Sequence, residues 1–143
     1  YRLSDINSAL GLSQLTKINF FLKKRKKIYQ KYFKELKNFN KKIIFPEYSK
    51  EIKPSYHLII INIPFDKLNN NKDDFMKYLN KNRIISQQHY IPIYKFSIYK
   101  ERKFNFSGSD KYFSNSVSIP IFVSLSEKEQ NKIISIIKNY FTK

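Results

Sequence analysis

The sequence contains no cysteine and only two glycines among 143 residues. Without cysteine it can form no disulfide, no thiolate metal site and no thiol nucleophile. Gly11 and Gly108 lie too far apart in the sequence to build a glycine-rich phosphate loop. The longest strongly apolar run, residues 58–63, is too short to cross a bilayer, and no signal-peptide pattern opens the chain. We therefore expect a cytoplasmic protein that does not enter a membrane.

Arginine is also scarce, although the formal net charge is +17. Only Arg2, Arg25, Arg83 and Arg102 among the 28 basic residues are arginines. Recognition of bases and phosphates favours the bidentate guanidinium, so a specific nucleic-acid partner is not expected. The basic run at residues 23–27 fits either a nucleic-acid patch or the solvated face of a helix. A positive field would equally suit an anionic sugar nucleotide, so charge alone leaves these interpretations open.

The hydrophobic share of 41% and the aromatic share of 17% are sufficient for a packed core of one domain. Ser4 is a good N-cap for a helix that runs to about Leu15. Apolar side chains then recur at three-and-four spacing from Ile18 to Leu36, which predicts a long amphipathic helix. The lysine run falls on the opposite face of that helix, as a solvated face would.

The rest of the chain alternates between strand and helix patterns. Residues 56–63, 84–89 and 118–122 are predicted strands, with a further short strand at 43–45. Helices are predicted after the N-cap Asn71, at residues 112–117, and after the capping box Ser126 and Glu129. This order predicts an α+β layer, in which a small, antiparallel sheet is covered by helices.

No self-sufficient active site is visible in the sequence. His57 and His89 are far apart in the chain, and no His–Glu spacing suggests zinc. No serine occupies a nucleophile elbow. We therefore predict neither catalytic residues nor metal ligands within this sequence.

Four short runs resemble one family. Residues 1–15, YRLSDINSALGLSQL, are similar to the N-Y-R-L-S-D-I-x-A-A-L-G-L-x-Q-L run of the DegT/DnrJ/EryC1/StrS aminotransferases. Residues 87–94, QQHYIPIY, resemble the Q-x-H-Y-x-P-[IV]-[HY] motif of that family, in the form found in enzymes of pseudaminic acid biosynthesis. Residues 55–58 and 118–129 resemble its small-domain strand and its closing S-L-P pattern. The matches occur in the family's order along almost the whole chain.

The resemblance implies the small C-terminal domain of a fold-type I aminotransferase that uses pyridoxal phosphate. Residues 1–40 would be helices connecting the large and small domains, and residues 41–143 the small α+β domain. The family moves an amino group from glutamate to a keto sugar nucleotide, here expected to be a 4-keto-6-deoxy sugar. The cofactor lysine is expected outside this sequence, so these residues alone would be inactive and the intact protein a homodimer. A stand-alone basic α+β module that binds nucleic acid or another polyanion is the alternative.

Four residues are candidates for substrate binding by this resemblance: His89, Tyr90, Arg2 and Tyr94. Imidazole and phenol groups can hydrogen-bond sugar hydroxyls, whereas the alternative for His89 is a buried histidine with satisfied nitrogens. Arg2 could meet a phosphate or a partner subunit, or form a salt bridge at its helix start. Tyr94 could line the substrate entrance or serve core packing. Residues that bind the cofactor stay unassigned.

One departure from the family pattern precedes the histidine motif. Family members usually have K-G-I-G there, and this chain has Asn82, Arg83, Ile84 and Ile85. Losing two flexible positions predicts a disturbed entry into the following strand, with a possible effect on activity.

Overall fold

The computed structural model describes residues 2–37, 39–68, 70–99 and 105–142. At its centre, strand β1 (Ile59–Asn62) pairs antiparallel with β2 (Ser116–Ile119). Single bridges extend the pairing on both sides, from Ile44 to Asn62 and from Gln87 to Ser118. The expected α+β class with a small antiparallel sheet is confirmed.

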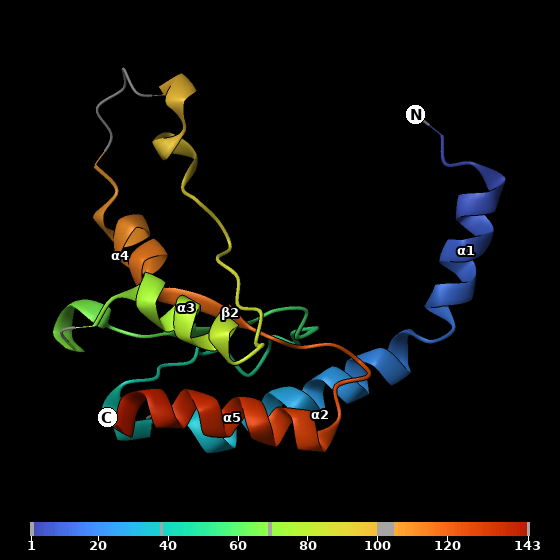
Figure 1. Cartoon of the computed structure of the whole chain (residues 1–143). Helices are drawn as coiled ribbons and strands as arrows, with labels where there is room; N and C mark the ends of the chain where they lie inside the picture. The colour runs from blue at the N-terminus through green and yellow to red at the C-terminus, as the bar shows by residue number, and fades with distance from the viewer. Residues whose placement is uncertain (1, 38, 69, 100–104, 143) are drawn as a thin grey trace.

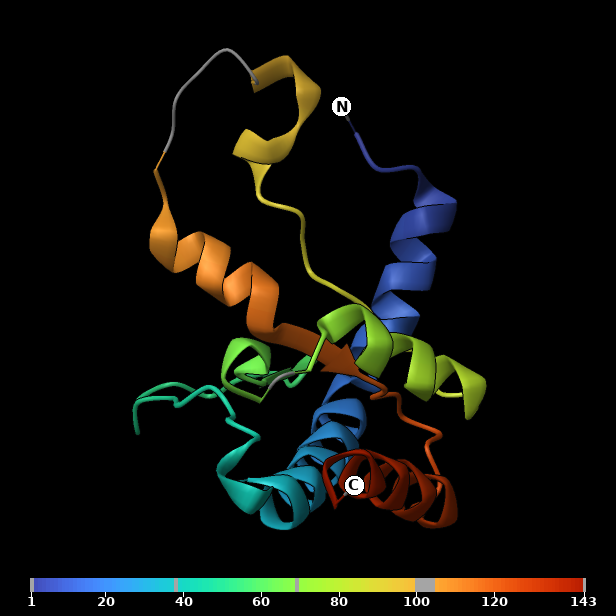
Figure 2. The ribbon, with the colours of Figure 1, turned by 60° about the vertical axis from the view of Figure 1, so that its left-hand side comes forward.

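Helices pack around this sheet and enclose the core. Helix α5 (Glu127–Thr142) packs against both α2 (Ile18–Leu36) and α3 (Lys72–Lys81). In Figures 1 and 2, α2 and α5 lie together beneath the strands. The core contains aromatic and branched aliphatic side chains from all of these elements, including Tyr32, Leu36, Ile59, Ile61, Phe75, Leu79, Val117 and Ile137, each no more than 1% exposed.

Polar contacts fix how α5 lies against α2. The Gln130 amide, itself buried, donates to the carbonyl oxygen of Ile28 at 2.8 Å. Lys138 meets Glu35 at 2.9 Å and Lys31 meets Glu127 at 2.6 Å, so ion pairs join the two helices near both ends of the contact. A buried amide that finds its partner only in one register specifies that register.

The predicted helix starts are confirmed by their caps. The Ser4 hydroxyl accepts from the backbone N–H of Asn7 at 3.3 Å, at the start of α1 (Asp5–Leu15). The Asn71 side chain accepts from the N–H of Asp73 at 2.8 Å. Ser126 and Glu129 form the reciprocal capping box, with backbone N–H bonds of 2.9 and 3.2 Å. These local signals set helix boundaries without tertiary help.

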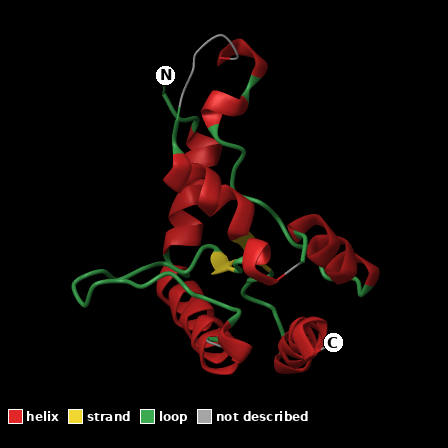
Figure 3. Cartoon of the chain, turned by 90° about the vertical axis from the view of Figure 1, so that its left-hand side faces the viewer, coloured by secondary structure: helices red, strands yellow, loops and turns green. Residues whose placement is uncertain are grey.

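The strand predictions were less accurate. The strand expected at 56–63 begins only at Ile59, since Tyr56 adopts a left-handed backbone with φ of 51°. The strands expected at 84–89 and 43–45 are reduced to the single bridges at Gln87 and Ile44. Figure 3 shows how little of the chain is strand.

The third expected strand and its helix are shifted along the chain. The strand predicted at 118–122 is β2 at Ser116–Ile119, followed by Pro120, which has no N–H to extend a ladder. The helix predicted at 112–117 is α4 (Ser107–Asn115), which starts earlier and ends where β2 begins.

Two arms project from the same side of this body (Figures 1 and 2). One is α1, in which no residue is buried and Ile6 is 83% exposed. The other, called here the aromatic arm, comprises residues 90–99 and 105–115, with the short 3-10 helices Ile93–Lys95 and Ser97–Tyr99 and helix α4. Tyr90, Ile93 and Ile98 on it are 67–81% exposed. Within the described ranges, no helix is both long and apolar enough to cross a membrane.

Helix α3 ends in a turn whose geometry normally selects glycine. The N–H of Ile84 donates to the carbonyl of Leu79 at 2.9 Å, and that of Arg83 to the carbonyl of Asn80 at 2.8 Å. This pair of bonds is a Schellman motif, in which the residue after the C-cap is left-handed. Arg83 holds that position with φ of 62°. The turn therefore forms without glycine, and the chain still reaches its bridge at Gln87.

We predict that Arg83→Gly stabilises the fold. A left-handed L-residue costs about 1–2 kcal/mol, and the greater freedom of glycine in the unfolded chain offsets part of the relief, leaving a gain of about 0.5–1 kcal/mol. The measurement is the urea midpoint of the purified protein at unchanged denaturant slope. Arg83→Ala is the control, because alanine also has a Cβ and should give no such gain; equal stabilisation by both changes would contradict a backbone origin.

Candidate functional site

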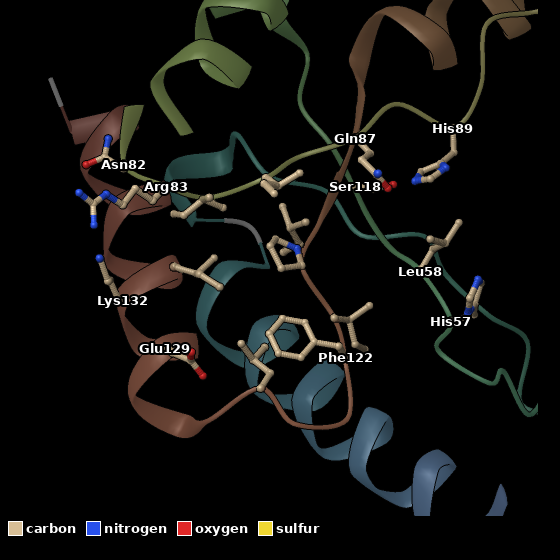
Figure 4. Close-up of a pocket in the computed structure, with 17 residues that line it drawn as sticks. His57, Leu58, Asn82, Arg83, Gln87, His89, Ser118, Phe122, Glu129 and Lys132 are labelled. Carbon is tan, nitrogen blue, oxygen red and sulfur yellow. The ribbon is translucent and has the colours of Figure 1, made fainter. Parts of the chain in front are cut away.

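A pocket of about 530 Å³ opens where the chain leaves β2. It lies between the first turns of α5, the turn after α3 and the residue that precedes β1 (Figure 4). Its walls are mainly apolar and include Leu58, Ile84, Ile119, Ile121, Phe122 and Ile133, and its polar residues include His57, Asn82, Arg83, Gln87, His89 and Lys132. Apolar walls with a few polar groups, at this volume, are typical of small-molecule sites.

His89 is placed in this pocket by the bridge that precedes it. Gln87 exchanges backbone hydrogen bonds with Ser118, at 3.1 and 2.8 Å. The Gln88 amide donates to the carbonyl of Phe113 at 3.1 Å, which ties the same segment to α4. His89 follows directly, and its ring lines the pocket.

The polar atoms of the His89 ring are unusual. Both ring nitrogens are shielded from solvent and find no hydrogen-bond partner within the described part of the chain. An imidazole has at least one donor and one acceptor to satisfy, and leaving such a buried group unpaired costs about 1–3 kcal/mol. Among the described residues, His89 therefore does not match the alternative considered above, a core histidine with satisfied nitrogens. The ring has bonding capacity for a group outside the described residues.

Tyr90 does not point into the same pocket. Its ring meets the His89 ring edge-on, with centroids 4.8 Å apart and an interplanar angle of 89°, and the side chain is 75% exposed. The peptide bond between the two residues is cis. Tyr90 is therefore available to a larger ligand or to another polypeptide, on the outer side of His89.

Tyr94 belongs to the aromatic arm and packs within it. Its ring centroid lies 4.9 Å from that of Phe106. The carboxylate of Asp110 on α4 forms an ion pair with Lys95 at 2.6 Å. The pKa of Asp110 lies below its ordinary value, mainly because its carboxylate is hydrogen-bonded to the Lys95 ammonium. The Tyr94 hydroxyl also lowers this pKa, whereas desolvation raises it. This network agrees with the packing alternative for Tyr94.

Lysine side chains join the root of the aromatic arm to the body. Lys72, at the start of α3, donates to the carbonyl of Phe113 at 2.6 Å and lies 4.3 Å from the centroid of its ring. Burial lowers the pKa of Lys72. The Lys95 ammonium lies 4.9 Å from the same ring centroid. Cation–π and carbonyl contacts thus fix α4, and with it the segment that carries His89.

Arg2 lies apart from the other three candidates. It is exposed and precedes α1, on the opposite arm in Figure 1. Neither the salt bridge considered for it nor a contact with His89 is found among the described residues. The structure thus brings His89 and Tyr90 together, with Tyr94 nearby in the chain, and leaves Arg2 outside the pocket.

Sequence reasoning missed His57, Arg83 and Lys132 as pocket residues. His57, far from His89 in the sequence, lines the same pocket. The missed signal was the family resemblance at residues 55–58, of which His57 and Leu58 line the pocket. Arg83 was noted only as a departure from a glycine, and Lys132 only as part of the last helix.

The fold is shared with known aminotransferase structures. PseC from Helicobacter pylori, an aminotransferase involved in the biosynthesis of pseudoaminic acid, superimposes with a TM-score of 0.88 at 27% identity, over 99% of this chain and 38% of that chain. An aminotransferase from Brucella abortus superimposes with a TM-score of 0.84 at 25% identity, over 99% of this chain and 37% of the other. The described fold is that of part of a sugar aminotransferase.

Sequence comparison gives the family. The DegT/DnrJ/EryC1/StrS aminotransferase profile matches residues 1–138, and the chain belongs to that family. The UDP-4-amino-4,6-dideoxy-N-acetyl-beta-L-altrosamine transaminase of Helicobacter pylori is 32% identical over 147 aligned positions, which cover 98% of this chain and 38% of that protein. Its namesake from Campylobacter jejuni (serotype O:23/36) is 30% identical over 133, covering 90% and 34%. The chain spans little more than a third of the length of these relatives.

We predict that Lys95→Ala raises the pKa of Asp110 toward its ordinary value, because the largest cause of its lowering is removed. Because the pKa of Asp110 is lower in the folded state, the Lys95–Asp110 pair stabilises the fold fully at pH values above the ordinary carboxyl pKa. This stabilisation is lost as the pH falls through the lowered pKa. An NMR titration of the Asp110 carboxyl carbon measures the shift. Lys111→Ala, which removes an exposed lysine beside Asp110, is the control; an equal shift there would mean that the general positive field is responsible.

Proposed function

We propose that the intact protein transfers an amino group from glutamate to a 4-keto-6-deoxy sugar nucleotide, in amino-sugar biosynthesis of the pseudaminic acid type. The observation that carries this proposal is His89, which combines a place in the family motif at residues 87–94 with an unsatisfied imidazole in a pocket. The names of the Helicobacter and Campylobacter relatives support the choice of sugar. The alternative of a polyanion-binding module gains no support from any of these comparisons.

Pyridoxal phosphate, the proposed cofactor, supplies the electron sink for amino transfer when bound. The described residues do not themselves fit it. Lys72, whose pKa is lowered by burial, is held by the Phe113 carbonyl outside the pocket, and Lys132 is exposed at the pocket's rim. We therefore assign the cofactor and its lysine to the part of the intact protein that this chain does not cover.

For this chain we propose a substrate-binding role. His89 would donate or accept a hydrogen bond to the sugar from the pocket, and Tyr90 would extend the contact on its outer side. Arg2 would meet a phosphate or the partner subunit. Tyr94 would act indirectly, by holding the aromatic arm through Asp110. We retain residues 1–40 as the connecting helices and residues 41–143 as the small domain.

The exposed apolar surface supports a larger assembly, proposed here as a homodimer. Helix α1 has eleven residues, and isolated helices of that length are marginal in water. Its residues Ile6, Leu10, Leu12 and Leu15, and Leu3 just before its N-cap, are all at least 60% exposed. Large apolar side chains exposed together in this way usually mark an interaction surface, so we assign their covering to the rest of the intact dimer.

We predict that the 143-residue chain alone does not retain pyridoxal phosphate. Without a suitably placed lysine it forms no covalent link, so the cofactor should pass through a desalting column separately from the protein. The measurement is the near-visible absorbance of the protein fraction, with the intact protein as the positive control. A retained band that disappears on borohydride treatment would contradict our assignment of the lysine.

We predict that His89→Ala in the intact enzyme lowers the rate of the sugar half-reaction by several-fold to a hundredfold. Loss of one hydrogen bond costs about 0.5–1.5 kcal/mol for a neutral partner and up to about 3 for a charged one. The glutamate half-reaction is the internal control and should be unchanged. A purely structural role would lower both half-reactions together, along with the folded fraction.

Lys128→Ala is the control variant, because it removes an exposed side chain of α5 that does not line the pocket. It should leave the sugar half-reaction within about twofold of the unmodified enzyme. Unchanged sugar turnover in folded His89→Ala protein would remove His89 from the substrate site.

A further inference from the structure

One end of the pocket carries two cations without acidic partners. Figure 4 shows the side-chain tips of Asn82, Arg83 and Lys132 at this end, opposite His57 and His89. Across the ranges that the structure describes, neither Arg83 nor Lys132 forms an ion pair. Two positive charges at one rim repel each other, so this arrangement favours an anion that lies between them.

Among the described residues that line the pocket, Glu129 is the one carboxylate, and it is already engaged. Glu129 accepts from the backbone N–H of Ser126 at 2.9 Å, and its hydrogen bonds to Ser126 lower its pKa. The capping box thus holds this carboxylate at the start of α5 rather than at Lys132 one turn later. The Asn82 amide donates one hydrogen to the Tyr78 carbonyl at 2.8 Å and retains another N–H. The rim therefore offers an ammonium, a guanidinium and an amide donor.

The backbone gives a separate argument that Arg83 matters as a side chain. Its left-handed conformation belongs to a position where glycine fits without strain. Strained backbone at a non-glycine residue is concentrated at functional sites. At this position the strained residue is Arg83, and its guanidinium lies on the rim of a pocket.

The rest of the pocket limits the kind of anion. In the same pocket, Phe122 is 44% exposed and Ile121 is half-buried. A ligand with an apolar or planar body can cover these side chains. The two cations match the charge of a phosphate monoester dianion better than that of a carboxylate, and arginine binds phosphate oxygens in a bidentate manner.

We propose that Arg83 and Lys132 form a binding site for the phosphate of a small organic phosphate, whose apolar or planar body lies along Ile121 and Phe122. The site does not depend on the proposed aminotransferase function. It uses Arg83, whose left-handed backbone is of the kind that glycine adopts without strain.

The test is a titration of the intact protein that contains this chain with phenyl phosphate, followed by NMR or calorimetry at low salt. Phenyl phosphate should bind at least about fivefold more tightly than inorganic phosphate, because only phenyl phosphate carries a ring. It should also bind at least about fivefold more tightly than benzoate, because phenyl phosphate carries a second negative charge. Arg83→Gly and Lys132→Ala should each weaken phenyl phosphate binding at least about fivefold. Raising the salt concentration should weaken binding, since both cations are exposed.

Two controls separate a site from a general effect. Arg83→Gly is expected to make the fold more stable, so its loss of binding cannot come from unfolding. Lys128→Ala removes an exposed lysine of α5 that does not line the pocket and should leave binding within about twofold. Undiminished binding by Arg83→Gly overturns the proposal. Equal losses for Lys128→Ala and Lys132→Ala also overturn it, because they would show a diffuse positive surface.

Discussion

The packing of α5 against α2 beneath β1 and β2 is the interaction on which the rest of the structure depends. Two four-residue strands are not stable by themselves in water, because an isolated two-stranded ribbon buries too little. Their core-facing residues are buried, and the Tyr32 hydroxyl on α2 donates to the carbonyl of Pro120 at 3.2 Å. This bond holds the chain directly after β2, where the pocket opens. The helices thus stabilise the strands and also position the pocket's wall.

Short-range hydrogen bonds fix the position of His89 relative to this body. β2 fixes Ser118, Ser118 fixes Gln87 by two backbone hydrogen bonds, and Gln88 reaches the Phe113 carbonyl. The same carbonyl accepts from Lys72 on α3. His89 directly follows these two anchored residues, so its backbone position is restricted and its unsatisfied ring nitrogens are held in place for a partner. This pre-organisation is what a binding residue needs.

The sequence predicted helices better than strands, for physical reasons. Helix signals are local: Ser4, Asn71 and the pair Ser126 and Glu129 each cap their own backbone, and all were identified. Strand limits depend on partners distant in the chain, and on backbone choices such as the left-handed Tyr56, for which composition gives no warning. The family motif identified His89 as a candidate. Its shared pocket with His57 and Arg83 arises from three separate segments, and no single-sequence pattern reports such proximity.

The body and the two arms differ in how much apolar surface they expose. The body has a core of fully buried aromatic and branched side chains, whereas α1 buries none and the aromatic arm leaves Tyr90, Ile93 and Ile98 exposed. Monomeric proteins rarely expose contiguous apolar surface of this kind unless it serves an interaction. Both arms lie on one side of the body, so a single partner surface between them could cover both (Figure 1). His89 lies at the base of the aromatic arm, where such a partner would meet the pocket. On this view the arm's ion pair, Lys95 with Asp110, positions the surface that completes the His89 site.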